Sequence, residues 1–163
     1  MTHFEWRALQ VDDTAALAQL FRAAVGQLAA ADYDASARAA WVSAADDEQA
    51  FATRLARGLT LVALCEGQPA GFAQLYPADH VEMLYVAPGY ARQGLAAGLL
   101  ARLEAVARLG GATALSADVS LSARRSFESA GFQMLAAETV RRNGVSLARF
   151  RMRKPLDAAH TQP

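Results

Sequence analysis

The stretch His80–Leu100, HVEMLYVAPGYARQGLAAGLL, decides the fold that this sequence predicts. It begins with an apolar run rich in strand-forming residues, and Pro88 then interrupts the run with a turn. After Gly94 the apolar residues recur at helical spacing. We therefore predict a strand over His80–Val86 and a helix over about Gly94–Leu109, joined by a loop.

The segments on either side of this stretch alternate between helix-like and strand-like patterns. Apolar periodicity predicts further helices at about 13–28, 36–44, 47–57 and 121–130. Asp12 or Asp13 is expected to cap the first of them. Strands are predicted at 4–10, 59–65, 70–76 and 112–120, and the sequence RRNGVS predicts a hairpin that joins two final strands.

The lengths of the connections indicate how these strands pair. Short turns between 59 and 86 favour antiparallel neighbours, whereas the strand, helix, strand unit from 80 to 120 favours a parallel pair. The predicted fold class is α/β, a single domain with a mixed, mostly antiparallel sheet of six to seven strands flanked by helices. We expect the domain to span residues 1–156 and residues 157–163 to form a disordered tail.

The composition excludes several function classes. The 163 residues carry 16 basic and 16 acidic side chains, so no global field attracts nucleic acid or an anionic membrane. No segment approaches the roughly 18 apolar residues of a membrane span. The N-terminus lacks a signal-peptide pattern, and the single cysteine, Cys65, excludes an internal disulfide and a cysteine-based zinc cluster. We expect a cytoplasmic protein without a metal ion, and the sequence leaves a homodimer open.

The loop around Gly94 is suited to bind an anion. The first N–H groups of a helix are unpaired, and the positive end of the helix dipole attracts a phosphate. Small side chains let a phosphate approach closely, and the loop is neither a GxxxxGK[ST] nor a GxGxxG motif. The alternative is that these small residues serve only helix packing. The candidate anion-binding residues are Arg92, Gln93, Gly94, Leu95, Ala96 and Ala97.

Two motifs and the order of the elements resemble the GNAT superfamily, the Gcn5-related N-acetyltransferases. LYVAPGYARQGLAAGLL is similar to the family's Leu-x-Val-x-Pro lead followed by Q/R-x-x-G-x-G/A. SLSARRSFESAGF is similar to its Asn-x-x-Ala-x-x-x-Tyr-x-x-x-Gly-Phe helix. The chain departs from these patterns at Ala91, Ser120 and Phe127. Within the superfamily, it most resembles bacterial small-molecule acetyltransferases whose acceptors are mostly undefined.

The resemblance implies a function and a donor site. The implied reaction moves an acetyl group from acetyl-CoA, as co-substrate, to a primary amine of a small molecule. Backbone groups at Leu84 and Val86 are implied to meet the pantetheine arm, and Ser120 and Phe127 to lie on the CoA side. Phe127 cannot reprotonate the CoA thiolate as the family's tyrosine does. Two alternatives remain: a non-catalytic CoA-binding module, and an acetyltransferase of protein or peptide amines.

Glu82 and His80 are the candidate catalytic residues. An alkylammonium acceptor must lose a proton, and residues i and i+2 of a strand project from the same face. We favour Glu82 as the base with His80 supporting it; alternatively, His80 belongs to a turn and Glu82 pairs with an arginine. Tyr85, Ser126, Ser120 and water are possible proton donors to the thiolate, and the sequence does not choose among them. Tyr85 is disfavoured because a regular strand places it on the opposite face from Glu82.

Tyr33 and Trp41 are candidate acceptor contacts. They lie where the front helices of the resembling enzymes cover the acceptor, although aromatic residues at helical spacing also form cores. Arg149, Arg151 and Arg153 alternate along the last strand and are expected to form a solvated face. An acidic acceptor or partner is the alternative for this basic series.

Overall fold

The seven strands form one mixed sheet. The computed structural model describes residues 2–156, so the predicted tail at 157–163 lies outside the described residues. The strand order is β1-β2-β3-β4-β5-β7-β6, and β4–β5 is the parallel pair, which confirms the predicted fold class. The strands are β1 (Glu5–Ala8), β2 (Leu59–Cys65), β3 (Gln68–Leu75), β4 (His80–Val86), β5 (Ala114–Ser120), β6 (Gln133–Arg142) and β7 (Val145–Pro155).

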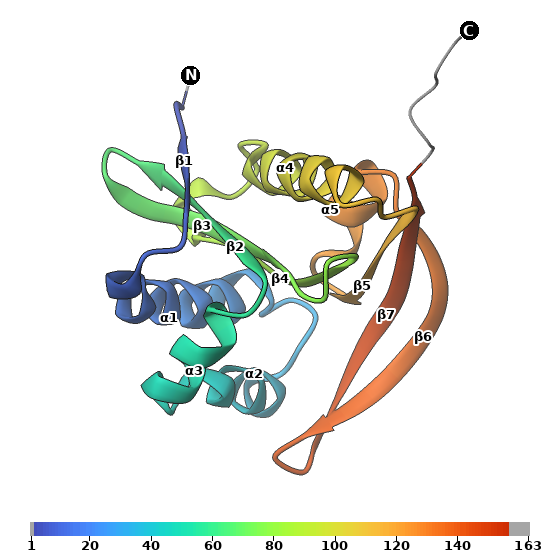
Figure 1. Ribbon diagram of the computed structural model, residues 1–163. Coiled ribbons are helices and arrows are strands. Elements are labelled where there is room, and N and C mark those ends of the chain that lie inside the picture. The colour runs from blue at the N-terminus through green and yellow to red at the C-terminus, as the bar shows by residue number, and fades with distance from the viewer. Residues whose placement is uncertain (1, 157–163) are drawn as a thin grey trace, which may run out of the picture.

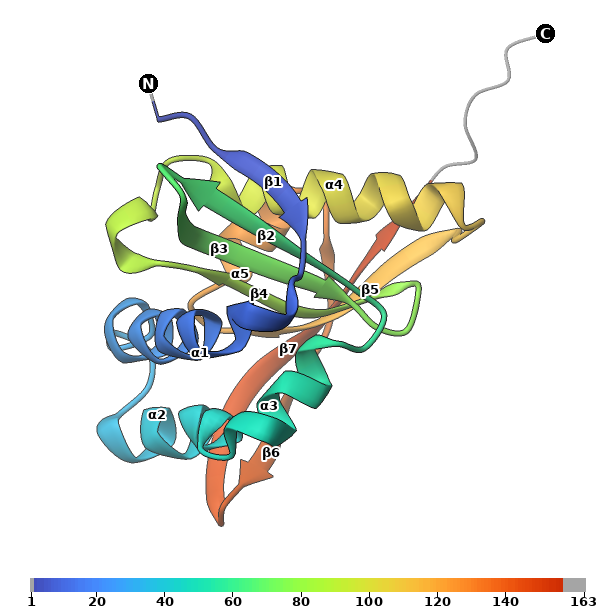
Figure 2. The same ribbon diagram turned by 60° about the vertical axis from the view of Figure 1, so that its left-hand side comes forward.

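Helices cover both faces of this sheet. Figures 1 and 2 show α1, α2 and α3 on one face and α4 on the other, with α5 beside α4. The helix α1 continues directly into a π-helical turn, Ala24–Leu28. The long β6–β7 hairpin reaches down beside α2 (Figure 1). The helices are α1 (Thr14–Ala23), α2 (Ala35–Val42), α3 (Glu48–Leu55), α4 (Leu95–Leu109) and α5 (Arg124–Ser129).

The sheet therefore has a hydrophobic core on each face. Adjacent residues Val62 and Ala63 of β2 are both fully buried, but they belong to different cores because successive side chains point to opposite faces. Leu99 and Leu103 of α4 pack into one core, and Phe21 of α1 packs into the other. Burial on both faces explains why these strands read as nearly continuous apolar runs.

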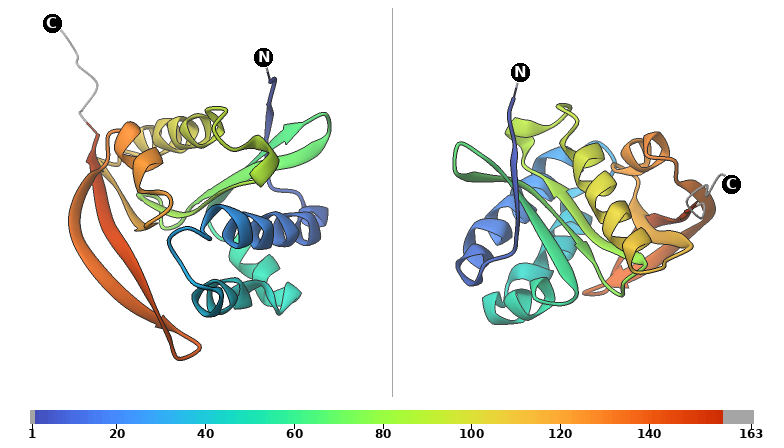
Figure 3. Two further views of the ribbon diagram at one scale, coloured as in Figure 1. Left: turned by 180° about the vertical axis from the view of Figure 1, so that it is seen from behind. Right: turned by 45° about the horizontal axis from the view of Figure 1, so that its top comes forward.

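The two central strands β4 and β5 stay together for only a short distance. They pair at His80 with Ser116 and at Val81 with Ala117, and beyond these positions the strands diverge (Figure 3). Toward the C-terminal end of β4, the edge that faces β5 therefore has no neighbouring strand to pair with. Main-chain groups at that edge must find other partners or water.

The start of α1 differs from the prediction in one contact. Asp13 occupies the N-cap position of α1, but its side chain makes no cap hydrogen bond to the helix. Its carboxylate instead accepts hydrogen bonds from the Arg7 guanidinium, at 2.7 and 2.9 Å, and from the Gln10 N–H. The Arg7 hydrogen bond holds the pKa of Asp13 below its usual value. The residue thus ties β1 to α1.

Across residues 2–156, no helix combines the length and apolar character needed to cross a membrane.

Candidate active site

A cavity of about 180 Å³ opens where β4 and β5 diverge. The divergence exposes side chains and main chain that a continuous sheet would cover. Predicted CoA-side residues line this cavity from three elements: Leu84 and Val86 of β4, Ser120 of β5 and Phe127 of α5. We call it the donor cavity. The structure brings these four residues together, although they lie far apart in the sequence.

The loop before α4 leaves the helix N-terminus open. Gly94 is the N-cap in a left-handed conformation, φ 80°, and a Cβ there would meet no atom within 4 Å. Glycine is thus favoured by the backbone angle and not by lack of space. The first main-chain bond of α4 runs from Gly98 N to Gly94 O, and no side chain caps the preceding N–H groups. Those groups, from Leu95 to Ala97, suit an anion.

The side chains of the loop have several different roles. Ala96 lines the donor cavity, whereas the Leu95 side chain is buried in the core. The Gln93 side chain bonds to neighbouring protein groups. Its Oε1 accepts from Thr2 Oγ1 at 2.5 Å, and its Nε2 donates to Gly89 O at 3.3 Å. Arg92 is exposed. Helix packing therefore applies to the Leu95 side chain, whereas anion binding by the open N–H groups of the same segment stays a prediction.

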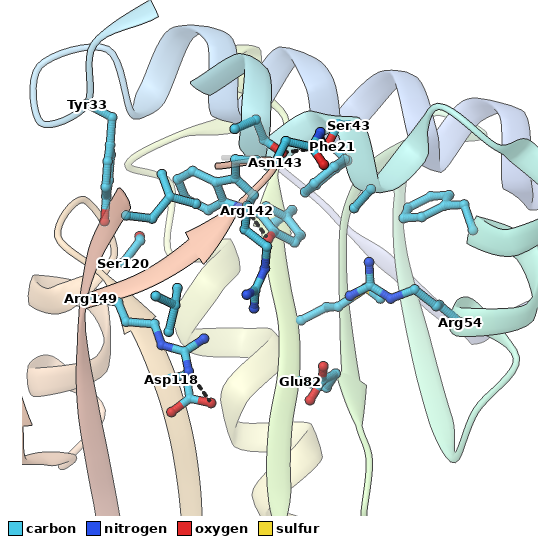
Figure 4. Close-up of a pocket in the computed structure, with 18 of the residues that line it drawn as sticks. Phe21, Tyr33, Ser43, Arg54, Glu82, Asp118, Ser120, Arg142, Asn143 and Arg149 are labelled. Atoms are coloured by element: carbon cyan, nitrogen blue, oxygen red, sulfur yellow. Dashed lines mark hydrogen bonds and ion pairs between the residues drawn. The ribbon is translucent and has the colours of Figure 1, made fainter. Parts of the chain in front are cut away.

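A second cavity, of about 520 Å³, lies beneath the front helices (Figure 4). Tyr33 and Trp41 both line it, as do Phe21 and Phe51. We call it the acceptor cavity. The Tyr33 hydroxyl accepts from the Leu121 N–H at 2.9 Å and donates to the Ala148 carbonyl at 2.5 Å, so the ring is fixed by its polar end.

His80, Glu82 and Asp118 form a close group at the floor of this cavity. The His80 Nε2 lies 3.6 Å from Glu82 Oε2 and 3.8 Å from Asp118 Oδ2. The other ring nitrogen, Nδ1, is 2.7 Å from Ser116 Oγ, which fixes the ring plane. Within the described chain, no cluster of three or more histidine, cysteine or acidic side chains could hold a metal ion.

A β-bulge at Glu82 changes the face of the sheet toward which the following side chains of β4 point. Gln74 of β3 opposes Met83, and Leu75 opposes Val81, so Glu82 is the extra residue. The expectation that Tyr85 points away from Glu82 is therefore wrong, because the strand is not regular. Both residues line the same cavities. The Tyr85 hydroxyl accepts from Trp41 Nε1 at 3.1 Å. Burial of this hydroxyl raises the pKa of Tyr85 to about 12.

The two cavities meet in the centre of the molecule. His80 lines only the acceptor cavity, whereas Ala96 and Phe127 line only the donor cavity. The residues that line both are Trp41, Glu82, Met83, Tyr85, Asp118 and Ser120. A donor entering from one side and an acceptor entering from the other would thus meet beside two carboxylates and two hydroxyls.

Sequence reasoning missed several charged residues of the acceptor cavity. Asp118 is a charged residue within an otherwise largely apolar strand, a pattern that could have identified it. Arg149 was expected on a solvated face but lines the cavity, where its guanidinium lies 2.7 Å from Glu138 and 3.7 Å from Asp118. Arg151 and Arg153 are exposed, as predicted. Arg54 and Arg142 also line the cavity, and no sequence pattern marked them.

Comparison with known proteins identifies the family. Residues 29–154 match the family model of the acetyltransferase (GNAT) domain. An uncharacterized N-acetyltransferase of Escherichia coli K12, YafP, is 31% identical over 153 residues, which are 94% of this chain and 97% of that protein. The chain therefore belongs to the GNAT acetyltransferases, as its motifs predicted.

Solved structures agree with this assignment. A GCN5-related N-acetyltransferase from Rhodopseudomonas palustris is 40% identical with a TM-score of 0.93, covering 96% of this chain and 98% of that one. YncA of Salmonella typhimurium, solved with acetyl-CoA, is 26% identical with a TM-score of 0.63, covering 99% and 98%. The protein is an acetyl-CoA-dependent N-acetyltransferase. The alternative of a non-catalytic CoA-binding module, which rested on Ala91 and Phe127, is set aside.

Proposed function

We propose that the protein transfers the acetyl group directly from acetyl-CoA to a primary amine of a small molecule, with Glu82 as the general base. The observation that carries this proposal is the junction of the donor and acceptor cavities at Glu82. Direct transfer requires both substrates to meet at one point, with a group beside it that accepts the amine proton.

The donor side fits CoA through main-chain groups. The open N–H groups from Leu95 to Ala97 and the dipole of α4 would hold the pyrophosphate, with Arg92 exposed nearby. The unpaired edge of β4 would offer main-chain groups of Leu84 and Val86 to the pantetheine arm. Phe127 would form an apolar wall.

Glu82 is favoured over its neighbours as the base. It lines both cavities, whereas His80 lines only the acceptor cavity. Asp118 also lines both, but its carboxylate has an arginine as ion-pair neighbour, the Arg149 guanidinium at 3.7 Å. In residues 2–156, the ion-pair partner of Glu82 is His80. His80, held by Ser116, supports the carboxylate from the side and acts as a positioning residue.

The proton for the departing thiolate comes from solvent in this scheme. A thiol has an ordinary pKa of about 8.5, whereas burial raises the pKa of Tyr85 to about 12. Transfer of a proton from Tyr85 to the thiolate is therefore uphill, although its hydroxyl can donate a hydrogen bond. Tyr85 orients groups at the junction and does not replace the tyrosine that is absent at Phe127.

The size of the acceptor cavity supports a small-molecule acceptor. Its volume of about 520 Å³ falls within the range of about 300–1,000 Å³ that small-molecule sites occupy. Aromatic walls around a few converging polar groups are also typical of such sites. A peptide acceptor would require a groove open along its length.

Glu82→Gln tests the proposal. We expect kcat/KM for amines to fall by about 10²–10⁴-fold, because the amide cannot accept the proton, while the KM for acetyl-CoA changes little. His80→Ala should lower kcat/KM less and alter its pH profile. Glu128→Gln, an exposed carboxylate on α5 paired with Arg124, is the matched control. If Glu82→Gln keeps the wild-type rate and pH profile while Asp118→Asn loses activity, Asp118 is the base.

A further inference from the structure

Two arginines that line the acceptor cavity have no ion-pair partner among residues 2–156. Arg149 has two carboxylate neighbours, Glu138 and Asp118. Arg54 and Arg142 also line the cavity, and neither forms an ion pair with any carboxylate in residues 2–156. Apart from its neighbour's carbonyl, Arg141 O at 3.1 Å, the Arg142 guanidinium has no hydrogen-bond partner in this part of the chain.

These arginines face the same space as the carboxylates of Glu82 and Asp118. Figure 4 shows Arg54 entering the cavity from the side of α3 and Arg142 from the end of β6, with Glu82 and Asp118 across from them. The Arg54 charge acts on the Tyr85 hydroxyl at the junction of the two cavities, where it opposes the rise of that pKa. A ligand at Glu82 therefore lies within the field of Arg54.

The main-chain segments that carry these two arginines are held in place, although Arg142 itself is exposed. The buried Gln74 amide donates to three carbonyls at the end of α3, those of Arg54, Leu55 and Arg57, at 2.6–3.2 Å. The hairpin beside Arg142 is tied to the front helices by Asn143 Nδ2, which donates to Ser43 Oγ at 2.9 Å. The main chain that carries each guanidinium is thus fixed before a ligand arrives, which lowers the entropic cost of binding.

From this arrangement we infer that the acceptor is an amino carboxylate: Glu82 receives the proton of its amine while Arg54 and Arg142 bind its carboxylate. The inference rests on the proposed amine acetylation. Guanidinium groups bind carboxylates through paired, charge-assisted hydrogen bonds, and partial removal from water strengthens them. Phe21, Trp41 and Phe51 form an apolar wall for the body of the molecule. The cavity thus recognises both charges of a zwitterion.

Matched acceptors test this inference with acetyl-CoA as donor. Two sets are used: L-phenylalanine with L-phenylalaninamide and 2-phenylethylamine, and 4-(aminomethyl)benzoate with benzylamine. We expect the carboxylate member of at least one set to exceed its neutral analogues in kcat/KM by about tenfold or more. In addition, 3-phenylpropionate, which lacks an amine, should inhibit competitively against the acceptor and not against acetyl-CoA.

Variants of the two arginines assign the effect to the cavity. Arg54→Gln and Arg142→Gln should each reduce the carboxylate-to-neutral ratio by about tenfold and weaken inhibition by 3-phenylpropionate. Arg54→Glu should shift the preference toward diamines, because it reverses the charge. Arg153→Gln, which removes an exposed arginine of β7 outside the cavity, is the matched control and should keep the wild-type ratio.

The outcomes separate this inference from the proposed function. Acetylation of neutral amines at rates equal to or above those of the amino carboxylates overturns the inference alone. A carboxylate preference that survives both arginine substitutions also overturns it, because residues other than Arg54 and Arg142 would then bind the acceptor's carboxylate. Acetyl-CoA binding without acetylation of any member of either set overturns the proposed function and the inference together.

Discussion

The donor and acceptor sides of this site are built in different ways. The main-chain part of the donor side is one segment, from Leu84 to Ala97, whereas β5 and α5 supply side chains such as Ser120 and Phe127 to the rest of the cavity. The acceptor side is built from side chains of three helices, two central strands and the β6–β7 hairpin. A main-chain site leaves a local pattern of glycine and alanine in the sequence. A side-chain site depends on contacts that only the folded chain creates.

The largest expected effect tests whether the donor side is controlled by one backbone angle. Gly94→Val places a β-branched residue at φ 80°, a conformation that costs about 1–3 kcal/mol for a residue with a side chain. The loop should shift, and the KM for acetyl-CoA should rise by about tenfold or more. Steady-state kinetics with acetyl-CoA as the varied substrate measures this, and the acceptor KM should remain near the wild-type value.

Gly89→Val is the control within the same loop, because it introduces the same residue. A Cβ at Gly89 would meet no atom within 4 Å, as at Gly94, but its φ is not in the left-handed region. The two positions therefore differ in backbone angle and not in available space. An equal loss of acetyl-CoA affinity in both variants would contradict the view that the angle at Gly94 sets the donor site.

An intermediate effect is expected from Tyr33, which connects distant parts of the acceptor side. Tyr33→Phe removes the hydroxyl that joins the Leu121 N–H to the Ala148 carbonyl. The free energy of unfolding should fall by about 1–2 kcal/mol, since both main-chain groups lose a partner but remain partly accessible to water. Urea denaturation measures this, and the acceptor KM should rise while that for acetyl-CoA does not.

Tyr76→Phe provides the reference for this change. Its ring is 41% exposed, and its hydroxyl makes no hydrogen bond within residues 2–156. Removal of that hydroxyl should leave the free energy of unfolding unchanged. A loss of stability in Tyr76→Phe as large as that in Tyr33→Phe would mean that the bridge across the acceptor side contributes nothing of its own.

The smallest effect concerns the contact that joins β1 to α1, the helix that supplies Phe21 to the acceptor cavity. The Arg7 hydrogen bond lowers the pKa of Asp13, so the folded state favours the carboxylate. This stabilisation is complete above the unfolded pKa, about 4, and is lost as pH falls through the lower folded pKa. Asp13→Asn should therefore cost about 1 kcal/mol at neutral pH and nothing at strongly acidic pH.

Denaturation curves at several pH values check this last prediction. Asp12→Asn is the matched control, because Asp12 is exposed and its side chain makes no hydrogen bond or ion pair within the described residues. It should follow the wild-type pH dependence of stability. A difference between Asp13→Asn and wild type that grows on acidification would contradict the sign of the linkage.

The elements that the sequence predicted best are those with local causes. The strands β2 and β4 have the predicted bounds, and α4 begins one residue after its predicted start, where Gly94 ends the loop. The hairpin at Asn143 and Gly144 has φ values of 48° and 75°, as its turn sequence requires. Each of these features depends on residues that are neighbours in the chain, so periodicity and turn chemistry suffice to predict them.

The errors arose where distant residues decide the conformation. The bulge at Glu82 depends on how β3 pairs with β4, and a regular alternation placed Tyr85 on the wrong face. Arg149 was expected in solvent because nothing in β7 indicates Glu138 and Asp118 beside it. For the same reason, no pattern in α3 identified Arg54 as a cavity residue. The charge of the acceptor site could not be read from a single strand or helix.

The bulge at Glu82 also bears on how such an enzyme can change over evolution. Because Glu82 has no residue opposite it in β3, its side chain contributes little to the packing of the sheet. The side chain is 38% exposed, and substitutions at such surface positions usually alter stability by less than about 0.5 kcal/mol. The proposed general base can therefore be exchanged without rebuilding the scaffold. Because Glu82 is an extra residue in β4, a substitution there can change the proposed proton acceptor with little effect on the stability of the fold.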